Sequence, residues 1–382
     1  MTLEPNQDQA AVAATARAFA RDRVAPAAAA NDKAGALPAG LIRELGELGL
    51  LAVNLPAEFG GSEAGAVAAA LSLMELAAAD ASVAVVASVT NMVAETIFKY
   101  GSPGQRERHL SRLASGEYLA GSFGLSEAGA GSDASALATR AVRRGERWVL
   151  DGAKQWITSG DVAGVLVVWA RTDPALAGGK PVTAFLVEPG MPGFTVGRHE
   201  EKMGQRASST VSLSFDGLEL PDEARLGTIG QGLAIALSAL DGGRIGIAAQ
   251  ATGTMRAALD AATAYAKQRR AFGKPIAEHQ AISFMLADMA TWHDAARLMT
   301  LRAASLKEAR RPFGHAAAMA KLFASEASQR VVDRAVQIFG GYGYTEEYPV
   351  AKLFRDARVQ TIYEGTSEIQ RVVIARQLLR DP

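Results

Sequence analysis

The spacing of apolar residues changes twice along this 382-residue chain. Up to about residue 116, apolar side chains recur every three or four positions, as in Leu41, Ile42, Leu45 and Leu48, which is typical of helices. Short valine-rich runs between glycines and prolines then indicate strands, at 165–169, 182–187 and 211–215. Helical spacing returns near residue 233 and predicts long helices over 233–268, 277–310 and 313–339, followed by a final helical segment.

These changes predict three domains, because the chain is too long for one simple core. We expect an N-terminal α-helical domain over residues 1–117, a middle β-domain of antiparallel strands over 118–231, and a C-terminal α-helical bundle over 232–382. The fold class is therefore mainly α with a central β-domain. Long helices joined by short turns predict an antiparallel bundle for the last domain.

Two helix starts carry clear local signals. Pro38 precedes an apolar helical face and predicts a helix that begins directly after it. Ser102, Pro103 and Gln105 combine an N-cap, a proline at the first helical position and a capping-box glutamine. A helix is therefore expected from residue 103 onward.

The composition limits the kinds of function. Lysine plus arginine and aspartate plus glutamate both total 40, and this zero net charge argues against a nucleic-acid-binding protein that works by neutralising phosphates. The absence of cysteine excludes disulfides, thiolate chemistry and cysteine-bound metals. We expect no metal site either, because the histidines lack metal-ligand spacing: His109, His199, His279, His293 and His315.

The sequence also predicts where the protein is found. Its first eight residues carry acidic side chains and no apolar core, so we expect no secretory signal. The longest apolar stretch, around 81–89, is too short to cross a bilayer and runs into Asn91. A soluble, cytoplasmic protein without membrane contact is expected.

One candidate for acid–base chemistry lies near the C-terminus. Helical spacing begins at about Ile369, and Ser367 with Gln370 fits a capping box, with Thr366 as the alternative cap. Glu364 therefore lies in the loop just before a helix, where exposed N–H groups favour an electron-rich ligand. From spacing alone, a solvated loop carboxylate is the more common interpretation.

Two nucleotide-binding patterns are rejected. Residues 129–134 fit the loose glycine fingerprint of dinucleotide-binding folds, but that fingerprint requires a strand before it and a helix after it. Residues 139–150 instead have the pattern of a hairpin. No glycine–lysine pair continues into serine or threonine, so a P-loop is absent from the sequence as well.

Several motifs together resemble the acyl-CoA dehydrogenase family, most closely its short-chain and butyryl-CoA dehydrogenase-like members. The C-terminal signature of that family is similar to residues 337–344, 355–358 and 362–371. The resemblance covers essentially the whole chain. It implies a fold with an N-terminal helical domain, an antiparallel β-barrel or sandwich and a C-terminal four-helix bundle. It also implies that Glu364 removes the α-proton of a short- or medium-chain acyl-CoA, giving a trans-2-enoyl-CoA in fatty acid β-oxidation.

The same resemblance implies FAD as the cofactor. Residues 123–133 are similar to the family's flavin-contacting loop, with Ala128 where the family usually has proline, and residues 152–160 are similar to the strand that packs on the flavin. A tryptophan in a strand is more often a core residue, so Trp156 gains its role from the neighbouring motifs. The implied FAD-binding residues are Phe123, Leu125, Ser126, Gly131, Ser132, Trp156, Ile157, Thr158, Arg269, Phe272, Gln280, Gln337, Gly340, Gly341, Thr366, Ser367 and Glu368.

The substrate site and partners follow from the resemblance too. Some relatives place the catalytic glutamate directly before the buried arginine, but here that position is Gly243, which leaves Glu364 as the base. Arg269 and its surroundings are similar to the segment that reaches the FAD of a neighbouring subunit, which implies a homotetramer; a surface ion pair with Glu278 is the alternative. An electron-transfer flavoprotein is the implied electron acceptor. The implied substrate-binding residues are Ser132, Asp241, Arg244, Tyr363 and Gly365.

Other functions remain open on the same scaffold. The chain could be an acyl-CoA oxidase, a desulfinase-type relative or a nitroalkane oxidase. A DNA-binding protective homologue is a further alternative, although it predicts a basic surface that the neutral chain does not suggest. The depth of the substrate pocket should depend on residues around 87–96 and 233–240, and the motifs favour short or medium straight acyl chains.

Overall fold

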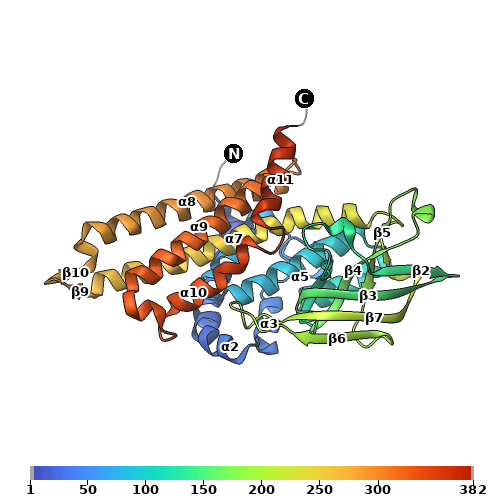
Figure 1. The fold of residues 1–382 in the computed structure, drawn as a ribbon, viewed down its shortest axis with the longest axis horizontal. Helices are drawn as coiled ribbons and strands as arrows, with labels where there is room; N and C mark the ends of the chain where they lie inside the picture. The colour runs from blue at the N-terminus through green and yellow to red at the C-terminus, as the bar shows by residue number, and fades with distance from the viewer. Residues whose placement is uncertain (1–3, 380–382) are drawn as a thin grey trace.

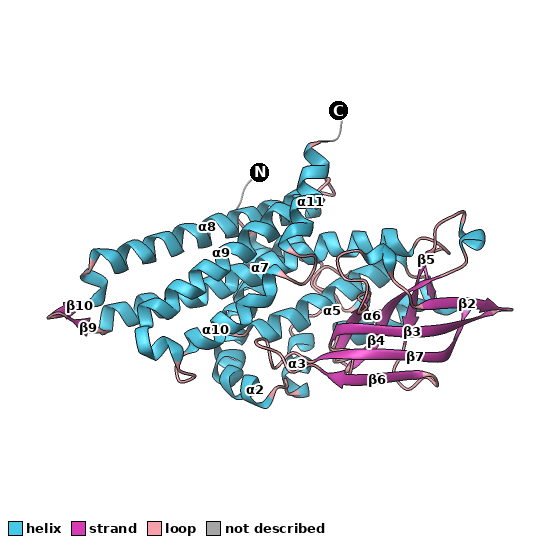
Figure 2. Ribbon diagram, viewed as in Figure 1, coloured by secondary structure: helices cyan, strands magenta, loops and turns pink. Residues whose placement is uncertain are grey.

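The chain is laid out along one long axis in the computed structural model, which describes residues 4–379 (Figure 1). A sheet lies at one end, and the small hairpin of β9 (Arg270–Ala271) and β10 (Lys274–Pro275) lies at the other. Figure 2 shows helices filling the length between these two ends. Residues 1–3 and 380–382 of the expected terminal domains lie outside the described residues.

The first part of the chain is helical, as predicted. The two predicted helix starts are confirmed: Pro38 precedes α3, and Ser102 with Gln105 forms a capping box at the start of α6. Asn6 and Gln9 form a second capping box that holds the start of the first helix. The helices are α1 (Gln7–Phe19), α2 (Ala28–Ala34), α3 (Ala39–Glu47), α4 (Gly65–Ala79), α5 (Ala81–Tyr100) and α6 (Pro103–Ala114).

Helix α5 corrects the expectation that its apolar stretch is too short to cross a bilayer. In the described residues, α5 and α7 (Gly232–Gln268) are both long and apolar enough to span a membrane by length and composition. Inside the protein, however, 83% of the apolar window of α5 and 56% of that of α7 are buried. Both helices therefore pack as core helices, and the apolar residues contact other parts of the chain.

The middle part forms a sheet with the strand order β6-β7-β3-β2-β4-β5-β8, and β1 pairs with β4. The expectation of purely antiparallel strands is wrong in one place, because β4 runs parallel to both β1 and β2. The pairing of β2 with β4 is limited to Arg140 and Arg171, so the sheet divides there into two halves. The strands are β1 (Ala120–Gly124), β2 (Arg140–Arg144), β3 (Arg147–Thr158), β4 (Ala163–Arg171), β5 (Val182–Val187), β6 (Phe194–His199), β7 (Thr210–Pro221) and β8 (Arg225–Leu226).

The two halves of the sheet pack face to face, as in a sandwich. Trp148 of β3 and Phe185 of β5 come from different halves, yet their rings meet edge to face with centroids 5.4 Å apart. Both side chains are fully buried. The core of the middle part therefore lies between the halves, where aromatic and β-branched residues face each other.

The last part is a bundle dominated by α7, α8 (Gln280–Glu308) and α9 (Gly314–Phe339). The expected fourth helix is divided into α10 (Pro349–Ala357) and α11 (Ser367–Leu378), and Glu364 lies between these two short helices. Helix α4 of the first part packs closely on α7. A Cβ at Gly253 would lie 2.2 Å from the carbonyl oxygen of Met74, so glycine is needed for this approach.

We propose domain boundaries between residues 117 and 118 and between 231 and 232. Helix α6 ends at Ala114 and β1 begins at Ala120, while β8 ends at Leu226 and α7 begins at Gly232. Both boundaries therefore fall in short segments that connect a helix to a strand.

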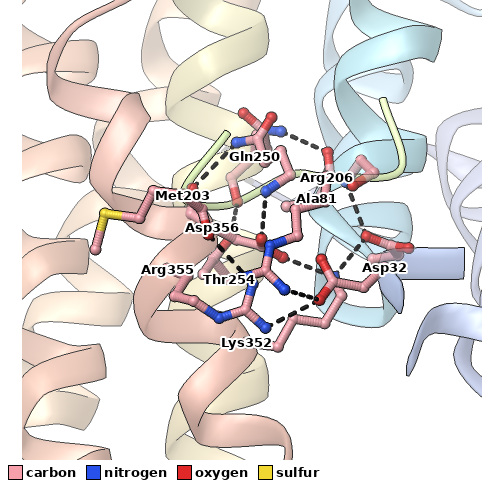
Figure 3. A network of polar contacts seen from close by, with 12 residues as sticks. Asp32, Ala81, Met203, Arg206, Gln250, Thr254, Lys352, Arg355 and Asp356 are labelled. Carbon is pink, nitrogen blue, oxygen red and sulfur yellow. Dashed lines mark hydrogen bonds and ion pairs between the residues drawn. The ribbon is translucent and has the colours of Figure 1, made fainter. Parts of the chain in front are cut away.

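A network of charged and polar groups joins the three parts of the chain (Figure 3). Lys352 of α10 donates to Asp80, which precedes α5, at 2.8 Å and to Asp356 at 2.6 Å. Arg355 of α10 donates to Asp32 of α2 at 2.9 Å and to the carbonyl of Met203, before β7, at 3.3 Å. Figure 3 shows these groups converging from the helical parts and the β6–β7 loop.

Lys352 is the central cation of this network. The carboxylates of Asp80 and Asp356 are fully buried. Although burial opposes its charge, these two carboxylates raise the pKa of Lys352, so the ammonium group stays protonated. The network thus compensates two buried negative charges with one buried positive charge at the place where the three parts meet.

Replacing Lys352 with methionine should lower the free energy of unfolding by about 3–5 kcal/mol, because two buried carboxylates lose their counter-charge. Thermal and denaturant unfolding of the purified protein measure this change. The matched control is Arg147→Met, which removes an exposed ion pair with Glu219 and should cost at most about 1 kcal/mol. Equal effects of the two substitutions would contradict the role assigned to Lys352.

Candidate active site

A cavity of about 500 Å³ lies between α4, α5 and α7. Its lining combines apolar side chains with a few polar groups, as expected for a pocket that binds a mostly apolar ligand. Along α5 the lining runs from Ser88 through Met92 to Tyr100, and along α7 it runs from Leu237 to Gly246. The expected pocket segments 87–96 and 233–240 thus contribute, but α4 and residues beyond 240 on α7 contribute too.

Glu364 lies beside this cavity on the segment between α10 and α11. A Cβ added at Gly243 would lie 2.6 Å from Oε2 of Glu364 and 3.0 Å from the sulfur of Met92, and both Gly243 and Met92 line the cavity. The carboxylate therefore occupies the space that a side chain at residue 243 would need. Residues 243 and 364, the two family positions for the base, therefore direct their side chains into the same space. Because residue 243 is glycine, the carboxylate of Glu364 fills that space.

The backbone at Glu364 is strained. Its φ is +53° and that of Gly365 is +86°, and a left-handed conformation is uncommon for a residue other than glycine. Two side chains hold the turn: Nε2 of Gln370 donates to the carbonyls of Glu364 at 3.2 Å and Gly365 at 2.8 Å, and Nζ of Lys321 donates to the Gly365 carbonyl at 2.7 Å.

The start of α11 corrects one expectation. Thr366, the alternative cap, is the N-cap, and its hydroxyl accepts from the N–H of Ile369 at 3.3 Å. Ser367 is the first helical residue, so its predicted capping box with Gln370 does not form. The side-chain oxygen of Gln370, which would accept in that box, has no hydrogen-bond partner, while its amide nitrogen donates to the turn carbonyls. The hydroxyl of Ser367 is buried and lacks a hydrogen-bond partner.

The electrostatics of the site centre on Glu364. Its Oε2 atom is buried and makes no hydrogen bond. Burial raises the pKa of Glu364 to about 7, although the nearby positive charges of Arg244 and Lys321 act in the opposite direction. Arg244 is itself buried and donates to Asp241, whose pKa is raised by burial. The site therefore offers a carboxyl group that can exchange a proton near neutral pH.

Tyr363 connects the site to the network in Figure 3. Its hydroxyl donates to the side-chain oxygen of Gln250 on α7 and accepts from Nε2 of Gln205 at 3.2 Å. Gln205 also donates its backbone N–H to Asp356. The hydroxyl of Tyr363, an expected substrate-binding residue, thus lies among groups from the domain junction. The side chain thus links the residue before Glu364 to α7 and to the β6–β7 loop.

The expected flavin loop is held firmly against β3. The side chain of Ser122 donates to the carbonyl of Thr158 at 2.7 Å, and the N–H of Gln155 donates to the carbonyl of Ser126 at 2.9 Å. These bonds bring together the segment of Phe123, Leu125 and Ser126 and that of Trp156, Ile157 and Thr158. Gly131 and Ser132 lie in the exposed part of the same loop.

A buried ion pair supports this loop. Lys154 on β3 is fully buried and donates to Glu127 at 2.7 Å and to the carbonyl of Leu125 at 3.2 Å. Glu127 also accepts from the N–H groups of Ala138 and Thr139. Burial lowers the pKa of Lys154 to about 8, although Glu127 acts in the opposite direction. The pair fixes both ends of the loop that carries Gly131 and Ser132.

Trp156 has an unusual backbone and an exposed ring. Its φ is +59°, and 54% of the residue is exposed although it lies within β3. The register of β3 shifts between Lys154 and Ile157, so the regular alternation of side chains along a strand is interrupted at Trp156 by a bulge. The bulge leaves the ring of Trp156 exposed to solvent. Space is also open at the neighbouring loop, because a Cβ added at Gly131 would contact no other atom. These features fit a large, flat aromatic ligand such as a flavin.

Of the other expected cofactor residues, Thr366, Ser367 and Glu368 lie at the start of α11, and the rest lie at the far end of the molecule from the sheet. Arg269 and Phe272 belong to the β9–β10 hairpin, far from the sheet that carries Trp156 (Figure 1). The guanidinium of Arg269 lies 5.8 Å from the ring centroid of Tyr342, and no ion pair with Glu278 forms within the described residues. Phe272 has a φ of +52° and is 95% exposed. The exposed residues Gln280, Gln337, Gly340 and Gly341 flank this end.

Four residues that support the site are not among the site residues expected from the sequence: Lys321, Gln370, Lys154 and Glu127. A signal for one of them exists, because Lys321 occupies a position of the buried stripe of α9 that is otherwise formed by small residues such as Ala317 and Ala324. Lys154 and Glu127 act through a contact distant in sequence, and Gln370 acts through the carbonyls of the turn just before its helix. Among residues 4–379, no group of three or more histidine, aspartate or glutamate side chains is placed to hold a metal ion.

Known sequence families match nearly the whole chain. The acyl-CoA dehydrogenase N-terminal, middle and C-terminal domains match residues 6–117, 122–218 and 230–379. The chain is also 47% identical, over 367 residues, to the mitochondrial short-chain specific acyl-CoA dehydrogenase of Bos taurus. That alignment covers 96% of this chain and 89% of the bovine protein.

Two solved structures share the fold over the full length of both chains. Butyryl-CoA dehydrogenase from Megasphaera elsdenii superposes with a TM-score of 0.96 at 42% identity. A chain in the structure of the electron transferring flavoprotein of Acidaminococcus fermentans gives a TM-score of 0.97 at 42% identity. The resemblance and fold class inferred from the sequence are confirmed, and the chain belongs to the acyl-CoA dehydrogenase family.

Proposed function

We propose that Glu364 is the base that removes the α-proton in the FAD-dependent dehydrogenation of an acyl-CoA to a trans-2-enoyl-CoA. The reaction class is that of the family to which the chain belongs. One observation carries the role of Glu364: its carboxylate borders the cavity with an oxygen that is buried and free of hydrogen bonds. Such an oxygen can accept a proton without first breaking an interaction within the protein.

FAD is the cofactor of this family, and when bound it takes up the hydride that leaves the β-carbon of the substrate. We assign the exposed ring of Trp156 to the flavin face and Thr158 to its edge. Phe123, Leu125, Ser126, Gly131 and Ser132 would hold the cofactor through the loop that Lys154 supports. The buried hydroxyl of Ser367, which lacks a partner in the chain, is a suitable donor near Glu364.

The cavity would hold the acyl chain and keep water away from the reacting carbons. Met92 and Gly243 lie next to Glu364, and Ser88 and Gly246 lie one helical turn further along the same two helices. An acyl chain that follows this path places its α-carbon near the carboxylate. The cavity volume of about 500 Å³ supports short or medium chains as substrates.

The groups around the Glu364 carboxylate define its chemistry. We propose that the backbone N–H of Glu364 donates to the thioester oxygen, which gains negative charge as the α-proton leaves. A pKa of about 7 makes Glu364 a base matched to neutral conditions. Arg244 lies buried behind the site with Asp241, which we assign to the substrate side together with Tyr363 and Gly365.

The separation of the expected cofactor residues supports an oligomer. The sheet that contains β3, the strand of Trp156, and the β9–β10 hairpin lie at opposite ends of one chain (Figure 1). We propose that Arg269, Phe272 and Gln280, with Gln337, Gly340 and Gly341, complete the FAD site of a neighbouring subunit in a homotetramer. A protruding phenylalanine that is almost fully exposed fits such a contact.

An electron-transfer flavoprotein is the proposed electron acceptor. A chain that closely resembles this one occurs in a structure of such a flavoprotein, which supports the assignment. A role in fatty acid β-oxidation and a cytoplasmic location stay predictions from the sequence.

Anaerobic mixing with a ladder of straight-chain acyl-CoAs should bleach the flavin absorbance, fastest with short or medium chains, because the cavity limits the length of the acyl group. Stopped-flow absorbance measures the rates. Readmission of air separates a dehydrogenase from an oxidase, since only the latter should regain its absorbance rapidly. A flavin that no acyl-CoA bleaches would contradict the proposed reaction.

The variant Glu364→Gln should bleach about 10²–10⁴-fold more slowly with FAD still bound, because the amide cannot accept the α-proton. The isosteric control Glu347→Gln alters an exposed carboxylate and should bleach at the wild-type rate. Equal rates for wild type and Glu364→Gln would show that another group is the base.

The pH profile reports the same base. Because burial raises the pKa of Glu364 to about 7, the carboxyl group is protonated and inactive below that pH. The value of kcat/KM should therefore rise with pH through about 7 and then level off, as measured with one acyl-CoA across a range of buffers. A rise centred near the ordinary glutamate pKa of about 4.3 would contradict the buried setting of this group.

A further inference from the structure

A fully buried lysine lies directly behind the turn that carries Glu364. Lys321 is on α9, and no part of it is exposed to solvent. Nζ donates to the carbonyl of Gly365 at 2.7 Å. A buried ammonium group is costly unless it is paired, because water solvates the charge far better than the protein interior does. Lys321 has no ion-pair partner at contact distance within the described residues, so its only short polar contact is the turn carbonyl.

The same carbonyl receives a second donor. Gln370 is also fully buried, and its amide donates to Gly365 at 2.8 Å and to Glu364 at 3.2 Å. Two buried donors from two helices therefore hold one strained turn. They differ in one property, since Lys321 carries a charge and Gln370 does not. A comparison of the two residues therefore separates the effect of holding the turn in place from the effect of a positive charge near Glu364.

The charge of Lys321 acts on few groups. Among the carboxylates, Glu364 on the turn interacts most strongly with this charge, and Glu368 on α11 and Glu326 on α9 interact more weakly. Arg244 on α7 is the other positive charge that acts on the site. Burial lowers the pKa of Lys321 to about 8, although Glu364 acts in the opposite direction. In this dry setting a positive charge favours the ionised form of Glu364.

We propose that Lys321 is a positioning residue for the base: it holds the Glu364 turn through the Gly365 carbonyl and favours the ionised carboxylate with its charge. This inference rests on the proposed role of Glu364 in proton removal. Lys321 acts on the reaction through Glu364, because the short polar contact of its side chain within the described residues is to the Gly365 carbonyl of the same turn.

Four variants separate the two roles of Lys321. Lys321→Met removes the donor and the charge, Lys321→Gln removes the charge while it retains a donor, and Lys321→Arg retains both. Gln370→Met is the matched control, since it removes the uncharged donor to the same carbonyl. Two readouts serve all four variants: the pH profile of kcat/KM, and a difference infrared titration of the protonated carboxyl band that Glu364→Gln lacks. The infrared titration needs no turnover.

Lys321→Met and Lys321→Gln should raise the titration midpoint of Glu364 by about 1 pH unit, because a neighbouring positive charge is lost. Lys321→Arg should restore the wild-type midpoint. Gln370→Met should slow bleaching without moving the midpoint. If the methionine variant does not fold, the glutamine variant makes the same comparison.

The proposal would be overturned if Lys321→Gln or Lys321→Met loses thermal stability or rate while the midpoint stays at the wild-type value. A downward shift would overturn it as well. Failure of the proposed function looks different: no acyl-CoA bleaches the wild-type flavin, while the infrared titration still reports whether Lys321 acts on Glu364.

Discussion

The left-handed turn at Glu364 and Gly365 is the constraint on which the rest of the site depends. A glutamate with positive φ is unfavourable in an isolated chain and persists only where surrounding contacts impose it. Here Lys321 and Gln370 impose it from two helices by donating to the same carbonyl. The turn directs the Glu364 carboxylate against Gly243, beside the cavity. The division of the expected fourth helix into α10 and α11 creates the segment in which such a turn can form.

The turn is tied to the architecture of the whole chain through its neighbour, Tyr363. The Tyr363 hydroxyl bonds to Gln250 on α7 and to Gln205 from the β6–β7 loop, and Gln205 bonds in turn to Asp356. The ion pairs of Lys352 then extend this network to α5. The base is thus held at the junction of the three parts of the chain, so the relative placement of those parts fixes the geometry of the site. Substitutions that break this network should therefore change the position of the Glu364 carboxylate, although Tyr363 is the only residue of the network that is adjacent to Glu364.

Much of this arrangement is readable from the sequence, and the parts that are not share a physical cause. The helical regions, the middle sheet and the capping box at Ser102 follow from local periodicity and local hydrogen bonds, which a sequence displays directly. The motif around Glu364 is readable through family resemblance, but its cap is not, because Thr366 and Ser367 are both suitable capping residues and the backbone of the turn before them decides which one caps the helix. The parallel pairing of β1 with β4 and the bulge at Trp156 also depend on partners distant in sequence. The buried position of Lys321 on α9 follows from the sequence, but its role does not, since that role depends on a carbonyl 44 positions away.

In the proposed reaction, Glu364 alone takes the α-proton. The measurement that tests this claim most directly is the exchange of the α-hydrogens of a bound acyl-CoA with heavy water, followed by mass spectrometry under anaerobic conditions. This exchange reports proton removal separately from oxidation of the substrate. If Glu364 is the base, exchange occurs with the wild-type protein and is lost with Glu364→Gln while binding is retained. Exchange at an undiminished rate in Glu364→Gln would contradict this role of Glu364, because another group would then be removing the proton.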